Sequence, residues 1–333
     1  MDILILGLGT IGTLYGSLFF RAGHNVEHFL REGKDHVDCV HVKLLDGRLN
    51  PKGKELSFDY KIKPSTKKEY DFIFVSVSSG NLKEAMDCLR EAKIHGTVLL
   101  FTGVWTDHKR LDEIMGFYNY ILGYPVGGGS MDEEGVLTAV VNEYVMIESK
   151  SNARIPNYNL MMSLFKSCDI TFEIPHDMLE WMWVRMSVSA AIVSTVALYG
   201  NLSFPGPSVE YVMTNSKALA HCIRTIRETL LIARGRGINM NHFKQEILPY
   251  KFPAGISGWG MKVKFKTSRI ARESMKRHNN IDDLMYICYE VFHEGKRQCV
   301  PMPHFTENMQ AMLVKLEEQE HIDPSLYNHI KKF

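Results

Sequence analysis

The sequence predicts an α/β protein in which a doubly wound N-terminal sheet is followed by an all-helical C-terminal domain. Three observations lead to this prediction. A short apolar run at residues 3–6 breaks into a glycine-rich turn, the first half of the chain alternates strand and helix patterns, and the periodicity from Pro175 onward is almost entirely helical. Because 333 residues is long for one hydrophobic core, we expect two domains, residues 1–172 and 173–333.

The apolar run Ile3–Leu6 has the character of a buried strand, and a helical pattern follows it closely. Between the two lies the turn Gly7-Leu8-Gly9-Thr10-Ile11-Gly12. In this spacing the first glycine makes the turn, the second lets the backbone approach a pyrophosphate, and the third lets the helix pack closely on the strand. A coincidental glycine turn is the alternative. The position between a strand and a helix N-terminus favours a Rossmann-like dinucleotide site at these six residues.

The next strand bears on which dinucleotide binds. Residues 25–30 have strand character and lead into Arg31. A site for NAD usually ends this strand with an acid for the ribose 2′-OH, whereas a site for NADP places a cation there for the 2′-phosphate. The mixed charges at Glu32 and Lys34 leave a solvated loop arginine as the alternative. We favour NADP on the position of Arg31.

Further strands and helices alternate along the first half. The ranges 39–45 and 56–62 resemble an antiparallel excursion, and later strands are expected at 72–77, 97–101, 136–141, 144–147 and 170–174. Helices are expected after Asn81 and over 107–115. Ligands of such a sheet lie outside the carboxyl ends of its strands, where Ser78 and Thr102 are found. The glycine cluster at 124–130 is interpreted as a flexible loop rather than a second ligand contact.

The second half is punctuated by glycine, proline and polar residues into helical segments. These are expected at 178–198, 208–234, 241–248, 269–276, 281–294 and 305–318. The most apolar stretch, 186–198, is too short to span a bilayer and is interpreted as a buried helix. Two such domains side by side would leave a cleft for a small substrate.

Composition narrows the class of partner. The net charge is +1 and charged residues are 23% of the chain, so nucleic acid and membranes are not expected partners and small molecules are. The six cysteines show no CxxC pair and no metal-type spacing. We expect a cytoplasmic protein without a bound metal, and a homodimer through the helical domain is possible.

The order of these pieces resembles the ketopantoate reductase family, NADPH-dependent enzymes with a Rossmann domain and a helical C-terminal domain. The resemblance lies in the glycine turn, Leu30-Arg31, Asp71–Val77, Ile281-Asp282 and Val300–Pro303. In addition, Trp183-Val184-Arg185-Met186-Ser187-Val188-Ser189 looks like the family's Trp-x-Lys-Leu-x-x-Asn helix. The resemblance implies hydride transfer from NADPH to a small 2-oxo acid, ketopantoate or a related compound.

Several pocket positions depart from the family's pattern. The family's lysine general acid falls on Arg185, and arginine does not release a proton at neutral pH. The asparagine four residues later falls on Ser189, and the glutamate before Ile-Asp falls on Asn280. The positions of a lysine and an asparagine after two strands fall on Ser78 and Thr102. The resemblance thus implies Arg185, Ser189 and Asn280 as catalytic residues, with Gly7–Gly12, Arg31, Ser78 and Thr102 contacting the coenzyme.

Alternatives remain open at several of these residues. Arg185 either polarises a carbonyl or binds a carboxylate, or it is a structural arginine paired with Glu180. Lys262, Lys264 and Lys266 are interpreted as a solvated face, and His176 and His278 as surface or structural histidines rather than general acids. The alternative function is an NADP(H)-binding sensor or scaffold that has lost catalysis. A hydroxy acid or opine-type dehydrogenase is a third possibility.

Overall fold

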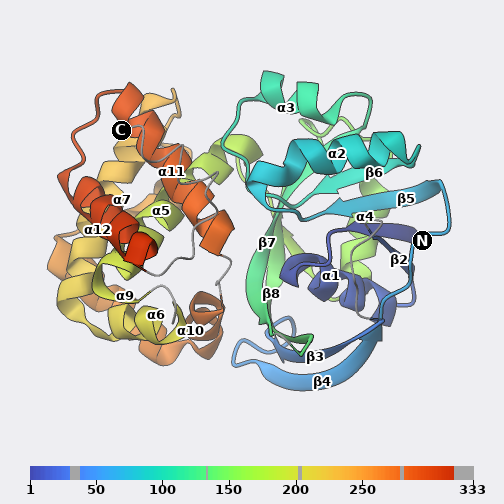
Figure 1. Cartoon of the computed structure of the whole chain (residues 1–333), viewed down its shortest axis with the longest axis horizontal. Helices are drawn as coiled ribbons and strands as arrows, with labels where there is room; N and C mark the ends of the chain where they lie inside the picture. Colours follow the sequence, from blue (N-terminus) through green and yellow to red (C-terminus); the bar gives the residue numbers. More distant parts are fainter. Residues whose placement is uncertain (31–37, 133, 202–204, 278–280, 319–333) are drawn as a thin grey trace. The chain divides into compact units, whose positions relative to one another are not determined.

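The computed structural model describes residues 1–30, 38–132, 134–201, 205–277 and 281–318, without the side chains of 281 and 282. Its contacts divide the chain into two compact units, coloured from blue to red along the sequence in Figure 1. The first unit is Met1–Met182 with Glu273–His278, and the second is Trp183–Arg272 with Asn279–Phe333. The division between consecutive parts falls ten residues beyond the expected boundary at 172, inside a helix.

The first unit is built on a nine-stranded sheet with the order β2-β1-β5-β6-β7-β8-β3-β4, and β9 pairs with β8. The parallel part consists of β1 (Asp2–Leu6), β2 (Asn25–Phe29), β5 (Glu69–Val75), β6 (His95–Leu100) and the start of β7 (Tyr120–Met131). The remaining strands are β3 (Cys39–Asp46), β4 (Lys54–Lys61), β8 (Val136–Ile147) and β9 (Thr171–Glu173). β3 and β4 form the expected antiparallel pair.

Helices cover both faces of this sheet, and its central strands are therefore buried on both sides. Figure 1 shows α2 (Leu82–Glu91) and α3 (His108–Met115) together on one side of β5 and β6, with α1 (Thr10–Arg21) on the other. α4 (Tyr158–Ser167), which sequence reasoning missed, joins α1 in the same hydrophobic core. Aromatic rings from α1, α4, β5 and the end of β6 meet there, at Tyr15, Phe19, Phe74, Phe101 and Phe165.

The interpretation of residues 124–130 as a flexible loop is wrong. They lie inside β7, paired with β8 from Gly123 opposite Ile147 to Met131 opposite Leu137. A Cβ atom at Gly127 would lie 2.5 Å from the Val140 carbonyl oxygen, and one at Gly129 would lie 2.6 Å from Cγ2 of Thr10. These glycines therefore allow close approach of β7 to its neighbours rather than flexibility. The two strands expected at 136–141 and 144–147 are likewise one continuous strand, β8.

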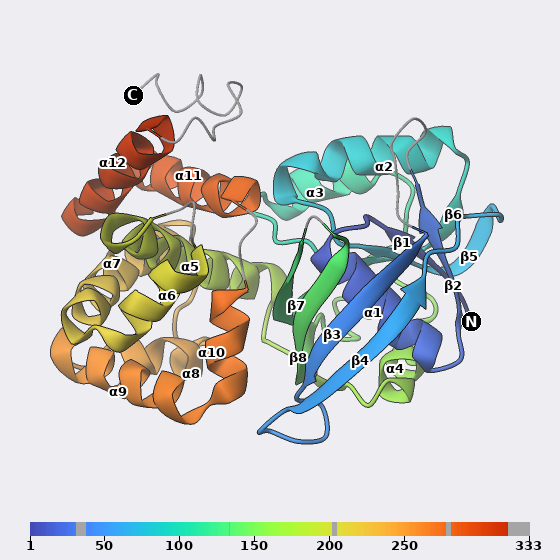
Figure 2. The ribbon, with the colours of Figure 1, turned by 60° about the horizontal axis from the view of Figure 1, so that its bottom comes forward.

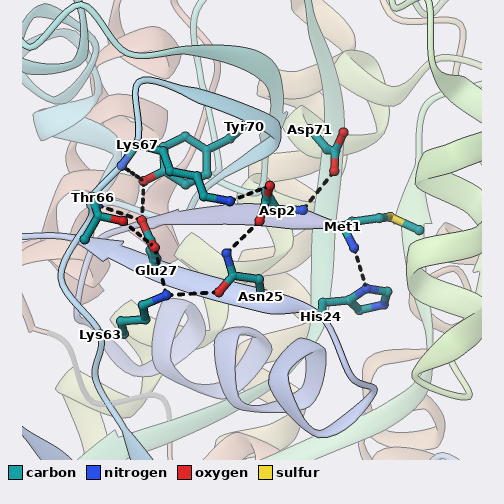
Figure 3. Close-up of polar contacts among 10 residues, drawn as sticks. All are labelled: Met1, Asp2, His24, Asn25, Glu27, Lys63, Thr66, Lys67, Tyr70 and Asp71. Carbon is teal, nitrogen blue, oxygen red and sulfur yellow. Dashed lines mark hydrogen bonds and ion pairs between the residues drawn. The ribbon is translucent and has the colours of Figure 1, made fainter.

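A polar network ties the amino ends of β1 and β2 to the segment before β5 (Figure 3). At its centre the buried Glu27 carboxylate accepts hydrogen bonds from the Tyr70 hydroxyl at 2.6 Å and from the Thr66 N–H at 2.7 Å, and it pairs with Lys63 Nζ at 3.0 Å. Burial raises the pKa of Glu27, but these partners outweigh burial and lower the pKa to about 2. The network stabilises the end of the sheet opposite the glycine turn.

The second unit is helical. α5 (Met178–Tyr199) begins in the first unit and continues into the second. It is followed by α6 (Pro205–Thr214), α7 (Ser216–Gly235), α8 (Lys244–Ile247), α9 (Ala254–Thr267), α10 (Arg269–Lys276), α11 (Ile281–Arg297) and α12 (Pro303–Glu318). Figure 2 shows α11 and α12 on one side of this unit and α8 and α9 on the other.

Two features of the helical unit differ from expectation. The helix expected at 208–234 is interrupted at Asn215, whose side chain accepts hydrogen bonds from the N–H groups of Lys217 and Ala218 and so caps α7. The lysine-rich segment 262–266, for which no helix was expected, is part of α9.

α5 is the one helix among the described residues that is long and apolar enough to cross a membrane. Because 67% of its most apolar window is buried within the protein, it also fits a core helix, as sequence reasoning expected.

Candidate coenzyme and substrate site

The turn after β1 has the backbone geometry of an anion cradle. Gly7 has φ +110°, a conformation that side chains rarely adopt, and it turns the chain out of the strand. Gly9 is the N-cap of α1 and makes no side-chain capping bond, and the Thr13 N–H donates to the Gly9 carbonyl at 3.0 Å. The N–H groups of residues 10–12 precede this ladder of hydrogen bonds and lie at the positive end of the helix dipole.

The three glycines of the motif differ in what surrounds them. A Cβ atom at Gly12 would lie 2.3 Å from the Gly7 carbonyl oxygen and 3.1 Å from Cγ2 of Ile5, so Gly12 permits close packing of α1 on β1. A Cβ atom at Gly9 would meet nothing within 4 Å. The space above Gly9 is therefore open to a ligand, and the turn fits the pyrophosphate of a dinucleotide.

The turn lies where the order of the sheet reverses. β1 pairs with β2 on one side and with β5 on the other, and Leu6 at the end of β1 is opposite Val75 at the end of β5. In open α/β sheets, ligands bind outside the carboxyl ends of the strands at this switch point. The Ser76 hydroxyl lies here too, buried and without a hydrogen-bond partner among the described residues. Sequence reasoning missed Ser76, whose only signal was a polar residue within an apolar run.

Ser78 and Thr102 lie at the same edge of the sheet. Ser78 is half-buried, and its carbonyl accepts a hydrogen bond from the Asn81 N–H at 2.9 Å as the one-turn helix η1 (Ser79–Asn81) begins. Thr102 is buried, and its hydroxyl donates to the Val77 carbonyl at 3.0 Å. Thr102 thus holds the backbone that carries Ser76 and Ser78, so any effect on a ligand is exerted through that segment.

The expected substrate residues Arg185 and Ser189 lie one turn apart on α5, in the helical unit. Arg185 is exposed and Ser189 is half-buried, whereas most of their neighbours on this helix are buried. Within the described part of the chain Arg185 has no carboxylate at ion-pair distance, so the alternative pairing with Glu180 is not observed. An unneutralised guanidinium beside a hydroxyl is suited to bind a carboxylate or a carbonyl oxygen.

Other candidates are dispersed. Lys264 and Lys266 are exposed on α9, Lys262 is half-buried there, and His176 is exposed before α5. Arg31, His278 and Asn280 lie outside the described residues. The structure therefore gathers Gly7–Gly12, Ser78 and Thr102 at one edge of the sheet, and it places Arg185 with Ser189 on one face of α5.

The fold and the glycine turn define the first unit as a Rossmann-like domain of the dinucleotide-binding class. Residues 3–148 match the family described as ketopantoate reductase PanE/ApbA. The resemblance noted in the sequence is thus confirmed: the N-terminal part of the chain is a ketopantoate reductase-family domain.

Similar proteins extend the likeness over more of the chain. The chain is 23% identical over 251 residues to a 2-dehydropantoate 2-reductase of Pyrococcus abyssi (strain GE5 / Orsay), covering 72% of this chain and 76% of that protein. A dimeric ketopantoate reductase from Staphylococcus aureus superposes with a TM-score of 0.64 at 12% identity, covering 96% of this chain and 99% of that chain. D-mandelate dehydrogenase in a ternary structure with NADH and anilino(oxo)acetate gives 0.65 at 14% identity, with the same coverage. The expected fold class, a Rossmann-like sheet followed by a helical C-terminal region, is thus confirmed.

Proposed function

We propose that the protein is an NADP-dependent reductase that transfers hydride from NADPH to a small 2-oxo acid, ketopantoate or a related compound. The observation that carries this proposal is the glycine turn at the switch point, with open space over Gly9 and an uncapped helix N-terminus. The similarity to a 2-dehydropantoate 2-reductase supports the reaction class. The same similarities do not favour a sensor or scaffold that has lost catalysis.

Each residue of the site has a role in this reaction. The N–H groups at the start of α1 bind the pyrophosphate, Arg31 binds the 2′-phosphate, and Ser78 with Thr102 shapes the edge on which the coenzyme rests. The bound coenzyme supplies the hydride. Arg185 binds the carboxylate or polarises the carbonyl of the substrate, and Ser189 and Asn280 orient its oxygen atoms by hydrogen bonds.

The test is substrate-dependent oxidation of NADPH, followed by its absorbance with a panel of 2-oxo acids. We expect turnover with at least one acid, and we expect Arg185→Ala to lower kcat/KM by about 10²–10³-fold through the loss of one charged contact. The matched control is Lys264→Ala, at an exposed position in the same unit, which should retain wild-type turnover. Absence of NADPH and NADH binding in calorimetry would overturn the proposal.

The choice between NADPH and NADH is tested separately. D-mandelate dehydrogenase, similar in fold, was solved with NADH, so both coenzymes need to be compared. We expect Arg31→Ala to weaken NADPH binding by about tenfold or more while leaving NADH binding nearly unchanged, because the guanidinium contacts only the 2′-phosphate. Equal losses for the two coenzymes would contradict the assignment of Arg31.

We further propose that the protein acts in the cytoplasm on small molecules, without nucleic acid or membrane partners, as a homodimer formed through the helical unit. The near-neutral net charge supports the absence of nucleic acid and membrane partners. Exposed apolar side chains on α9 support a homodimer.

A further inference from the structure

The proposed reduction needs a proton for the carbonyl oxygen, and Arg185 does not supply one. An arginine side chain does not act as a proton donor at neutral pH. In the sequence motif, arginine stands where the resembling family has a lysine. A second group close to Arg185 therefore has to hold the transferable proton.

Tyr250 is placed beside the face of α5 that carries Arg185. It is the last residue of the short helix η2 (Leu248–Tyr250), and its ring packs against a core cluster that includes Val188 of α5 and Cys222 of α7. Val188 is three residues after Arg185, so these two side chains are neighbours on the helix surface. The tyrosine thus packs on a cluster formed by α5 and α7, and its phenol feels the positive charge of Arg185.

The backbone of Tyr250 is fixed, whereas its hydroxyl is available. Arg227 of α7 donates from Nε to the Tyr250 carbonyl at 2.7 Å, and another of its nitrogens donates to the Phe252 carbonyl. Within the residues that the structure describes, the Tyr250 hydroxyl has no hydrogen-bond partner, and it is not among the sealed, unpartnered polar atoms of the protein. A half-buried ring whose hydroxyl is not engaged by another described group is free to donate a hydrogen bond to a substrate.

The charges around the ring suit this role. Burial raises the pKa of the Tyr250 phenol above its ordinary value, whereas the positive charge of Arg185 lowers it and the Cys222 thiol opposes ionisation. The phenol is therefore protonated at neutral pH and able to donate. Once it has donated, the guanidinium of Arg185 stabilises the phenolate.

We propose that Tyr250 is the general acid of the reduction and that Arg185 is its electrostatic partner; this inference rests on the proposed function. A bound reduced nicotinamide coenzyme would supply hydride to the carbonyl carbon, and the π electron pair of the carbonyl would move to its oxygen. That oxygen takes the proton of the Tyr250 hydroxyl, whose O–H bond breaks. The phenolate then recovers a proton from water, and in the direction of oxidation the same atoms move in reverse.

The first test compares Tyr250→Phe with Tyr211→Phe, an exposed tyrosine of the same unit. Both substitutions keep the ring, so folding should be preserved. We expect Tyr250→Phe to lower kcat by about 10²–10⁴-fold with little change in KM, whereas Tyr211→Phe remains near wild type. The decline of kcat at alkaline pH, where the phenol ionises, should be absent from the residual activity of Tyr250→Phe. Wild-type kcat and an unchanged pH profile in this variant would overturn the proposal while leaving the proposed function intact.

The second test needs neither coenzyme nor turnover. The difference in phenolate absorbance between the wild type and Tyr250→Phe, titrated with base in the coenzyme-free protein, isolates one phenol among the 14 tyrosines. We expect Arg185→Gln to move this step to higher pH, because it removes the positive charge that favours the phenolate. A step that does not move would overturn the pairing of Arg185 with Tyr250, whether or not the protein proves to be a reductase.

Discussion

At the scale of single residues, the glycine turn separates requirements for binding from requirements for folding. Gly9 has ordinary φ and ψ angles and open space where a Cβ atom would lie, so nothing in the folded chain demands a glycine there. Gly12 has a carbonyl oxygen 2.3 Å from the same point. Gly9 is thus explained by a ligand, and Gly12 by the packing of α1 on β1.

This difference gives a paired prediction. Gly9→Ala should change the free energy of unfolding by less than about 1 kcal/mol, because only the N-cap preference is affected. It should weaken NADPH binding by tenfold or more, because the methyl group takes the space of the pyrophosphate. Gly12→Ala should lower the free energy of unfolding by about 2–3 kcal/mol through overpacking against backbone. Denaturant unfolding and coenzyme titration of both variants check this, and loss of stability in Gly9→Ala would contradict the ligand role of Gly9.

The sequence motif was sufficient to predict the turn because its glycines report backbone geometry directly. It was not sufficient for Ser76 or Thr102. The register between β5 and β6 determines the surroundings of both hydroxyls. It leaves the Ser76 hydroxyl without a described partner and lets the Thr102 hydroxyl donate to the carbonyl at the neighbouring strand end. Tyr250 was missed for a similar reason: its proximity to Arg185 arises from the packing of η2 between helices distant in sequence.

The Glu27 carboxylate makes the free energy of unfolding depend on pH in the acidic range. Its pKa lies at about 2 in the folded protein, below the ordinary value of 4.5. The stabilisation is therefore fully present above about pH 4.5 and is lost as the pH falls toward 2. We expect Glu27→Gln to lower the free energy of unfolding at neutral pH by about 2–3 kcal/mol, with the difference from wild type shrinking between pH 4.5 and 2. Glu69→Gln, at an exposed position of β5, is the control, and an equal effect of both variants would contradict this role for Glu27.

At the scale of elements, the periodicity of the sequence predicted which helices and strands exist better than it predicted where they begin and end. Strands β1, β5 and β6 were found because each contains a short run of buried apolar residues. β7 was misjudged because its glycines mimic a loop signal, although they serve close strand packing. The break between α6 and α7 was missed because the apolar pattern continues through Asn215, and only its side-chain caps reveal the interruption.

Several long-range hydrogen bonds of the helical unit converge on Asn308, a buried side chain of α12. Asn308 lies 2.7 Å from Nε2 of His221 on α7, and its amide nitrogen donates to the hydroxyls of Thr195 at 3.1 Å and Ser194 at 3.3 Å on α5. A fourth contact reaches Thr225 at 3.3 Å. This network joins α12 to α5 and α7 through buried polar side chains.

Removing the Asn308 side chain takes away the partner of the buried His221 Nε2. It also takes away an amide donor that three buried hydroxyls share, although those hydroxyls still donate to backbone carbonyls. We expect Asn308→Ala to lower the free energy of unfolding by about 2–4 kcal/mol, more than an ordinary single hydrogen bond contributes. Gln310→Ala, exposed on the same helix, should change it by less than about 0.5 kcal/mol. Chemical denaturation of the two variants would decide, and similar values for both would show that the network contributes nothing beyond helix propensity.

At the scale of the whole molecule, the sequence indicated two domains but not how the chain is divided between them. Residues Glu273–His278 belong by contacts to the first unit, although they lie far along the sequence within the helical half. Within that unit, the Ser274 carbonyl lies 3.5 Å from where a Cβ of Gly128 on β7 would stand. The packing of residues 273–278 against β7 depends on the shape of that strand, which the periodicity of the sequence does not indicate.

The helical unit also presents an apolar stripe that a second copy of the chain would cover. Ile256, Trp259 and Val263 recur at helical spacing along one side of α9, and the exposed Phe252 lies just before this helix. Trp259 and Ile256 are 64% and 58% exposed. The opposite side of α9 is packed on α7, with Gly258 in close contact with Ala220. Burying side chains of this size stabilises an association by roughly 1.5–3 kcal/mol each, so exposed apolar surface here favours an interface over a solvated face.

We therefore expect the wild-type protein to be a dimer in light scattering, with about twice the mass of the 38.1 kDa chain. Ile256→Glu combined with Trp259→Glu should give a monomer with an unchanged circular dichroism spectrum, because these side chains lie outside the core and two charges per copy would be desolvated in the interface. Val314→Glu, an equally exposed apolar position on α12, should remain dimeric. A wild type that stays monomeric at high micromolar concentration, or a doubly substituted variant that stays dimeric, would rule out this surface as the interface.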